Sequence, residues 1–167
     1  LVQGQARFDV AHEAGRPFTV HAPGRKVIAL GTAFDVDRLG GRTRITLISG
    51  RVAVVHAAAK QEIELKPGEQ LVADGDTVTV NPVNLELVTA WQNGQLAFDN
   101  ESLAAVVERM NRYSARRIEV ADARASHLSV SGVFNAGDVD GFVSTVTHYL
   151  PLQAQAGRGG RGVLTSR

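Results

Sequence analysis

Hydrophobic and polar residues alternate along the first half of the chain. Apolar side chains recur at every second position in residues 6–10, 43–47 and 77–80. Glycine- and proline-containing turns, such as residues 74–76, separate runs of this kind. A period of two with frequent turns predicts short strands, which assemble into sandwiches, barrels or solenoids. We expect residues 1–83 to be an all-β subdomain, a twisted sheet of solenoid-like form.

The spacing of apolar residues becomes helical in the second half. Two segments place them at i, i+3, i+4 and i+7, which is one face of a helix. They are Leu103, Val106, Val107, Met110 and Tyr113 in the first segment, and Val139, Phe142, Val143, Val146 and Tyr149 in the second. Each residue of the second set follows its counterpart by 36 positions, and Phe134 follows Phe98 by the same number. The matched spacing indicates an internal repeat.

Strand-like runs precede and follow each predicted helix. They are residues 95–98, 117–120, 128–134 and 152–156. This order predicts two βαβ units in tandem, a small repeat subdomain over residues 95–167, and an α+β class for the chain. Asp99 or Asn100 is expected to cap the first helix and Asp138 the second, since Asp and Asn accept hydrogen bonds from free backbone N–H groups.

A short junction, residues 84–94, joins the two predicted subdomains. It contains Trp91, the single tryptophan of the chain. Tryptophan is enriched both in cores and in binding hot spots because it combines a large apolar surface with one polar group. We interpret Trp91 as an anchor between the two subdomains.

The stretch AGRGGRG, residues 156–162, has two interpretations. Alternating arginine and glycine resembles an RNA-binding tail, but the same residues can form a turn between two strands. Strand-like sequence lies on both sides, in residues 152–156 and 163–165. Because glycine permits positive φ angles in tight connections, we favour a hairpin.

Composition narrows the function classes. The net charge is only +1, with 18 basic and 17 acidic residues, which argues against nucleic acid as a partner. The chain has no cysteine, so disulfides and thiolate sites are excluded. No apolar run approaches the length of a membrane span. Leu1 begins directly in strand-like sequence, and we expect the chain to be part of a longer protein.

No pattern of catalytic or metal-binding residues stands out. The five histidines are widely separated: His12, His21, His56, His127 and His148. Metal sites usually contain at least one closely spaced pair of ligands. Residues 74–76 resemble the start of a calcium loop, yet the glutamate that such a loop requires is replaced by Leu85. We therefore expect neither an enzyme nor a cofactor.

Several motifs together resemble the FecR family of transmembrane sigma-factor regulators. The most specific is Leu-Gly-Thr-Ala-Phe-Asp-Val in residues 30–36. The remaining motifs are residues 4–10, 16–20, 47–52, 65–70, 91–96, 111–113 and 130–134. The second half also resembles the short N-terminal (STN) domain of secretins and TonB-dependent transducers, which is built from βαβ repeats.

The resemblance implies an anti-sigma factor anchored in the inner membrane of a Gram-negative bacterium. A cytoplasmic segment, absent here, would bind an extracytoplasmic-function sigma factor. This chain would be the periplasmic region, which receives a signal from the N-terminal signalling domain of an outer-membrane TonB-dependent transducer. Such transducers often import iron chelates, so the resemblance implies control of iron uptake.

Two strand-like segments are candidates for docking the transducer. The candidate residues are Leu128, Val130 and Val133 in one segment, and Val163, Leu164 and Thr165 in the other. They would bind a partner by strand addition or beside a helix, although internal strands of a sheet would have the same sequence. The alternative function is a periplasmic envelope-binding module, for polysaccharide or a structural component, without a signalling role.

Overall fold

The computed structural model describes residues 1–13, 15–56, 62–157 and 161–167. The chain divides into two compact units, Leu1–Leu85 and Glu86–Arg167. The first unit contains the strands β1 (Gly4–Asp9), β2 (Phe18–Ala22), β3 (Arg25–Ala29), β4 (Ala33–Leu39), β5 (Arg42–Ser49), β6 (Val52–His56), β7 (Glu62–Leu65), β8 (Glu69–Asp74) and β9 (Thr77–Pro82).

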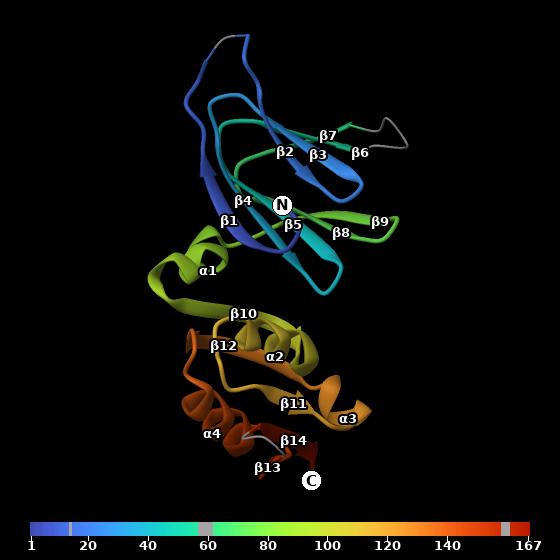
Figure 1. Ribbon diagram of the computed structural model, residues 1–167, viewed down its shortest axis with the longest axis vertical. Coiled ribbons are helices and arrows are strands. Elements are labelled where there is room, and N and C mark those ends of the chain that lie inside the picture. The colour runs from blue at the N-terminus through green and yellow to red at the C-terminus, as the bar shows by residue number, and fades with distance from the viewer. Residues whose placement is uncertain (14, 57–61, 158–160) are drawn as a thin grey trace. The chain divides into compact units, whose positions relative to one another are not determined.

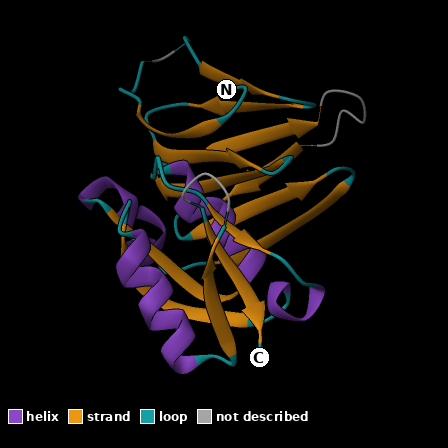
Figure 2. Cartoon of the chain, turned by 60° about the horizontal axis from the view of Figure 1, so that its bottom comes forward, coloured by secondary structure: helices purple, strands orange, loops and turns teal. Residues whose placement is uncertain are grey.

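Short helical elements begin where the first unit ends, and helices alternate with strands in the second. They are α1 (Leu85–Thr89) and the 3-10 helix η1 (Ala90–Asn93), followed by β10 (Gln95–Ser102), α2 (Leu103–Arg112), β11 (Ile118–Val120), α3 (Ala123–Ser126), β12 (Ser129–Asn135), α4 (Val139–Tyr149), β13 (Leu152–Ala156) and β14 (Gly162–Ser166). Strands throughout and helices confined to the later part agree with the expected α+β class (Figure 2).

The first unit is a sandwich of two antiparallel sheets (Figure 1). One sheet has the strand order β1-β4-β5-β8-β9 and the other β2-β3-β6-β7. All pairings within both sheets are antiparallel. The solenoid-like form expected from the sequence is therefore wrong. Period two specifies strands that have one buried face, but it does not specify whether they stack in coils or pair in hairpins.

One core lies between the two sheets. Each sheet contributes alternate residues, such as Val27 and Ala29 from β3 and Phe34 and Val36 from β4, and all four are fully buried. The Phe8 and Phe34 rings stack with centroids 5.1 Å apart. The alternation of apolar and polar residues that predicted these strands therefore corresponds to side chains that face the opposite sheet and side chains that face outward.

In the second unit the predicted strands and long helices occur in order, with the unpredicted short helix α3 between β11 and β12, but the strands pair differently. A βαβ unit normally has its two strands parallel in one sheet. Here β10 pairs antiparallel with β12 in a two-stranded sheet. β11 and β13 lie in a three-stranded sheet of order β11-β14-β13. The two strands of each repeat therefore belong to different sheets. Pairing between segments distant in the sequence, not the order of elements within a repeat, decides this arrangement.

The helix faces pack as their spacing predicted. Four of the five repeat residues of α2 are buried, from Leu103 to Met110, as are Val139, Phe142 and Val146 of α4. Tyr149 is an exception with 78% exposure, since it is the last residue of α4. The repeat therefore marks one common core between helices and sheets.

One of the two predicted helix caps is confirmed. Asp138 accepts a hydrogen bond from the backbone N–H of Gly141 at 2.9 Å and begins α4. The prediction of Asp99 or Asn100 for α2 is wrong, because β10 continues through Ser102. Ser102 caps α2 instead, its hydroxyl accepting from the N–H of Ala105.

The hairpin interpretation of AGRGGRG is confirmed by the flanking strands. β13 and β14 pair antiparallel from Leu152 opposite Ser166 to Ala156 opposite Gly162. Arg158, Gly159 and Gly160 lie outside the described residues. The guanidinium of Arg161 forms an ion pair with Glu119 of β11, so this arginine is engaged within the second unit.

Asp122 connects α3 to the last strand. Its carboxylate caps α3 by accepting from the N–H of Ala125 at 2.8 Å, and it accepts from the N–H of Ser166 at 2.8 Å. These two hydrogen bonds, the one from Ala125 most strongly, lower the pKa of Asp122. Folding therefore favours the ionised carboxylate over the protonated acid.

We expect Asp122 to stabilise the second unit at neutral pH and to lose this contribution in acid. The stabilisation is complete above the unfolded pKa of about 3.9 and is lost as pH falls through the lower folded pKa. Urea unfolding at a series of pH values should show a shallower acid loss for Asp122→Asn than for the wild type. Equal slopes below about pH 4 would contradict the prediction.

Candidate partner-binding surface

Two other features that would bear on function are a metal-binding cluster and a membrane-spanning helix. Among the described residues, no three His, Asp or Glu side chains gather closely enough to hold a metal ion. Within the same residues, no helix is long and apolar enough to cross a membrane. The sequence singled out two strand segments of the second unit; a strand of this kind can accept another strand only if it lies at the edge of its sheet, where backbone groups are unpaired.

β14 is a central strand, which corrects one of the two docking candidates. It pairs in parallel with β11 and antiparallel with β13, so both of its backbone edges are occupied. Leu164 is fully buried in the core, while Val163 and Thr165 are partly exposed. Strand addition at Val163–Thr165 is therefore excluded. The sequence could not reveal this, because the parallel pairing with β11 joins segments about forty residues apart.

β12 provides one open edge. Val130 is only 5% exposed and Leu128 packs against the core, so Val130 is corrected to a core residue. Val133, in contrast, is 52% exposed. The N–H of Ala136 donates to the carbonyl of Gly94, and hydrogen-bonded pairs alternate along an antiparallel ladder. The backbone N–H and C=O of Val133 therefore point away from β10.

β13 provides a second open edge, which the sequence reasoning missed. Its residues after Leu152 are all exposed, from Gln153 to Ala156. Hydrogen bonds from Arg167 to Pro151 and from Gly157 to Arg161 fix the phase of its ladder with β14. By the same alternation, Ala154 directs its backbone N–H and C=O away from β14. The correctly predicted hairpin already implied that one of its two strands could be an edge.

The remaining outer strand of this sheet, β11, has its edge covered at Ile118. The side-chain amide of Asn111 donates to the carbonyl of Ile118 and accepts from its N–H, both at 2.8 Å. These two bonds occupy the backbone groups that Ile118 directs away from β14. Asn111 thus satisfies the outward backbone groups of Ile118. Among the described residues, no side chain forms such hydrogen bonds with the outward N–H and C=O of Ala154 in β13.

Tyr149 is an exposed aromatic residue shortly before β13 in the chain. It ends α4 three residues before β13 begins, and 78% of its surface is exposed. Its ring meets that of His148 edge to face, with centroids 4.9 Å apart. Tyrosine is enriched among the residues that contribute most to binding at protein interfaces.

Trp91 lies in η1 and packs, partly buried, against the core of the second unit. Its interpretation as an anchor between the two subdomains stays a prediction. η1 ends at Gly94, which adopts a left-handed conformation with φ of 72°. Trp91 therefore lies immediately before the chain enters β10.

Comparisons with known proteins agree with this architecture. Residues 1–53 match the family model described as FecR protein. Two crystal structures of a protein assigned as an anti-sigma factor from Parabacteroides distasonis ATCC 8503 share the fold. The structure at 2.50 Å has a TM-score of 0.85 at 20% identity, and the structure at 1.65 Å has 0.84 at 21%. Each comparison covers 99% of this chain and 78% of the other. No curated protein matches.

Proposed function

We propose that this chain is the signal-receiving periplasmic region of an inner-membrane anti-sigma factor. Its partner would be the N-terminal signalling domain of an outer-membrane TonB-dependent transducer. Docking would control an extracytoplasmic-function sigma factor bound to a cytoplasmic segment, in a system for iron-chelate uptake. The match of residues 1–53 to FecR and the fold shared with anti-sigma factor structures support this proposal.

The open edge of β13 is the observation that carries the docking step. A strand of the partner placed along β13 would accept the outward N–H of Ala154 and donate to its carbonyl. Backbone pairing of this kind supplies affinity, while flanking side chains supply specificity. The exposed ring of Tyr149, which ends α4 three residues before β13 begins, would offer the partner an apolar contact. The STN-like half would then be the receiver, as the resemblance implied.

Binding can transmit a signal only if the partner has different affinities for two arrangements of the receiver. The junction, residues 84–94, contains the short elements α1 and η1, with which the second unit begins. Either a change at this junction or exposure of a site near the membrane to proteolysis would connect docking to release of the sigma factor.

Proline substitution at the free edge tests this mode of docking. In Ala154→Pro only an outward N–H is removed, so the ladder with β14 keeps its hydrogen bonds. Calorimetric titration with the signalling domain encoded beside this chain should show affinity reduced at least about tenfold. Ala154→Val keeps the N–H and is the matched control, which should bind within about threefold of wild type.

A second proline variant distinguishes the two edges. If Val133→Pro abolishes binding while Ala154→Pro does not, the partner docks on β12 and the assignment to β13 is wrong. If the folded wild-type chain does not bind the signalling domain at all, direct docking is wrong. Circular dichroism of each variant would establish that its secondary structure is retained.

A further inference from the structure

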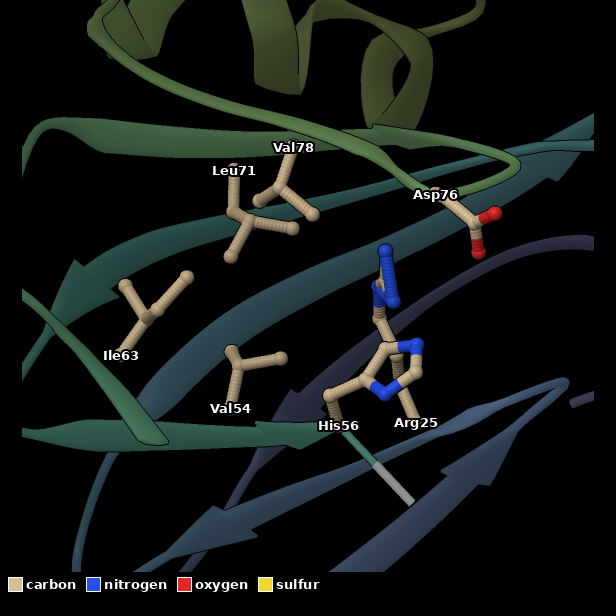
Figure 3. Close-up of a pocket in the computed structure, with 7 residues that line it drawn as sticks. All are labelled: Arg25, Val54, His56, Ile63, Leu71, Asp76 and Val78. Carbon is tan, nitrogen blue, oxygen red and sulfur yellow. The ribbon is translucent and has the colours of Figure 1, made fainter. Parts of the chain in front are cut away.

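The sandwich unit contains a cavity of about 180 Å³ between its two sheets. It is lined by Arg25, Val54, His56, Ile63, Leu71, Asp76 and Val78. Figure 3 shows the four aliphatic side chains around one part of the cavity, with Arg25, His56 and Asp76 together at the other. Both sheets contribute, since Val54 belongs to β6 and Leu71 to β8. The cavity thus has an apolar part and a charged part.

Arg25 is a buried cation with few hydrogen bonds and no ion pair in the described residues to offset the loss of its hydration. It begins β3, lies opposite His56 of β6 and is only 5% exposed. Its guanidinium donates one long hydrogen bond, 3.4 Å, to the carbonyl of Gly75. No ion pair to Arg25 is found within the described part of the chain. A guanidinium has five N–H donors, and burying such a group without an anion is unfavourable.

Arg44, on the five-stranded sheet, shows the usual arrangement for a half-buried arginine. It pairs with Asp37 at 3.4 Å. Arg25 instead faces a cavity, and the acid that shares this cavity, Asp76, is exposed in the turn between β8 and β9. Because Asp76 both lines the cavity and contacts solvent, the charged end of the cavity is accessible from solvent.

The dimensions restrict what could occupy the cavity. An engineered apolar cavity of about 150 Å³ binds benzene, so about 180 Å³ accommodates a compact molecule of similar or slightly larger size. The walls formed by Val54, Ile63, Leu71 and Val78 suit a branched aliphatic chain. Arg25 suits a carboxylate, which it can bind through two parallel hydrogen bonds.

We propose that this cavity binds a small aliphatic carboxylate, with its head group on Arg25 and its chain among the four aliphatic residues. Two sources share this chemistry, a short branched fatty acid and a free aliphatic amino acid. Only the amino acid has an ammonium group, which would lie toward Asp76 at the open end. The site would give the sandwich unit a ligand of its own, independent of docking on the second unit.

A purely structural role for Arg25 makes a different prediction. Its bond to Gly75 connects β3 to the turn of the opposite sheet, so loss of Arg25 would then alter stability alone. The two roles are separated by measuring binding and thermal unfolding on the same variants. Ligand-dependent stabilisation should occur in the wild type and be absent from the variants that cannot bind.

The experiment titrates the whole chain with 4-methylpentanoate, leucine and the neutral 4-methylpentanamide, followed by amide chemical shifts. We expect one of the two acids to bind with a Kd below about 1 mM and the amide at least about tenfold more weakly. Arg25→Gln should weaken the acid at least about tenfold. Arg42→Gln, which breaks an exposed ion pair with Asp74, is the matched control and should leave binding unchanged.

Two further variants complete the test. Val78→Phe should fill the cavity and abolish binding while leaving Arg25 in place. Asp76→Asn identifies the source, since it should weaken leucine if an amino acid binds and should not weaken 4-methylpentanoate if a fatty acid binds. The proposal is overturned if neither acid binds, if the amide binds equally well, or if folded Arg25→Gln binds as the wild type does.

Discussion

Replacing Phe142 by alanine should lower the free energy of unfolding of the second unit by about 3–5 kcal/mol. Phe142 is fully buried in the middle of α4, and its ring meets that of Phe134 edge to face at 5.0 Å. Removing the ring loses the favourable free energy of transferring it from water into the core, and it leaves a cavity among the residues that pack closely around it. Urea unfolding followed by the fluorescence of Trp91, which packs against the same core, would measure the loss.

Tyr149 is the matched control for this prediction. It occupies the same helix and the same 36-residue pattern, but 78% of its surface is exposed. Tyr149→Ala should therefore change the free energy of unfolding by no more than about 0.5 kcal/mol. Similar losses for Phe142→Ala and Tyr149→Ala would mean that the face of α4 that we describe as buried is not the one that forms the core.

Replacing Gly50 by alanine should destabilise the sandwich unit by about 2–5 kcal/mol. Gly50 has φ of 84°, and a Cβ there would lie 2.6 Å from the carbonyl oxygen of Gly31 and 3.0 Å from Cα of Thr32. The cost combines left-handed backbone strain with a clash against main-chain atoms that cannot rotate aside. The turn after β5 would have to separate from the segment before β4 to relieve it.

Gly68 isolates the backbone contribution. It has the same φ of 84°, yet a Cβ there would have no neighbour within 4 Å. Gly68→Ala should therefore cost only the conformational strain, about 1–2 kcal/mol. Thermal unfolding followed by far-ultraviolet circular dichroism would compare the two variants. A loss for Gly50→Ala no larger than that for Gly68→Ala would show that the close approach to Gly31 is unimportant.

Local spacing predicted the elements of this chain well. The runs at residues 152–156 and 163–165 became β13 and β14, and the hairpin between them was predicted from its glycines. The two helix faces were predicted from residues such as Val106 and Phe142, which are fully buried. These predictions succeeded because burial on one face of a helix or strand leaves a period in the sequence itself.

The candidate surface was predicted only in part. Of the candidate docking residues, Val133 is exposed, whereas Val130 and Leu164 are in the core. The open edge at Ala154 was not identified, and neither was the cover that Asn111 provides for β11. Edge or centre is a property of how strands are ordered in a sheet, and the sequence of a single strand does not contain that order.

The sequence by itself determined where the two long helices lie, which of their faces is buried, and where the last two strands form a hairpin. Only the tertiary structure decided that the first unit is a sandwich, that each repeat is divided between two sheets, and that Arg25 shares a cavity with Asp76. The physical reason is the range of the interactions. Periodicity reflects the burial of neighbouring residues, whereas sheet order and cavities arise when distant segments compete to pair and pack.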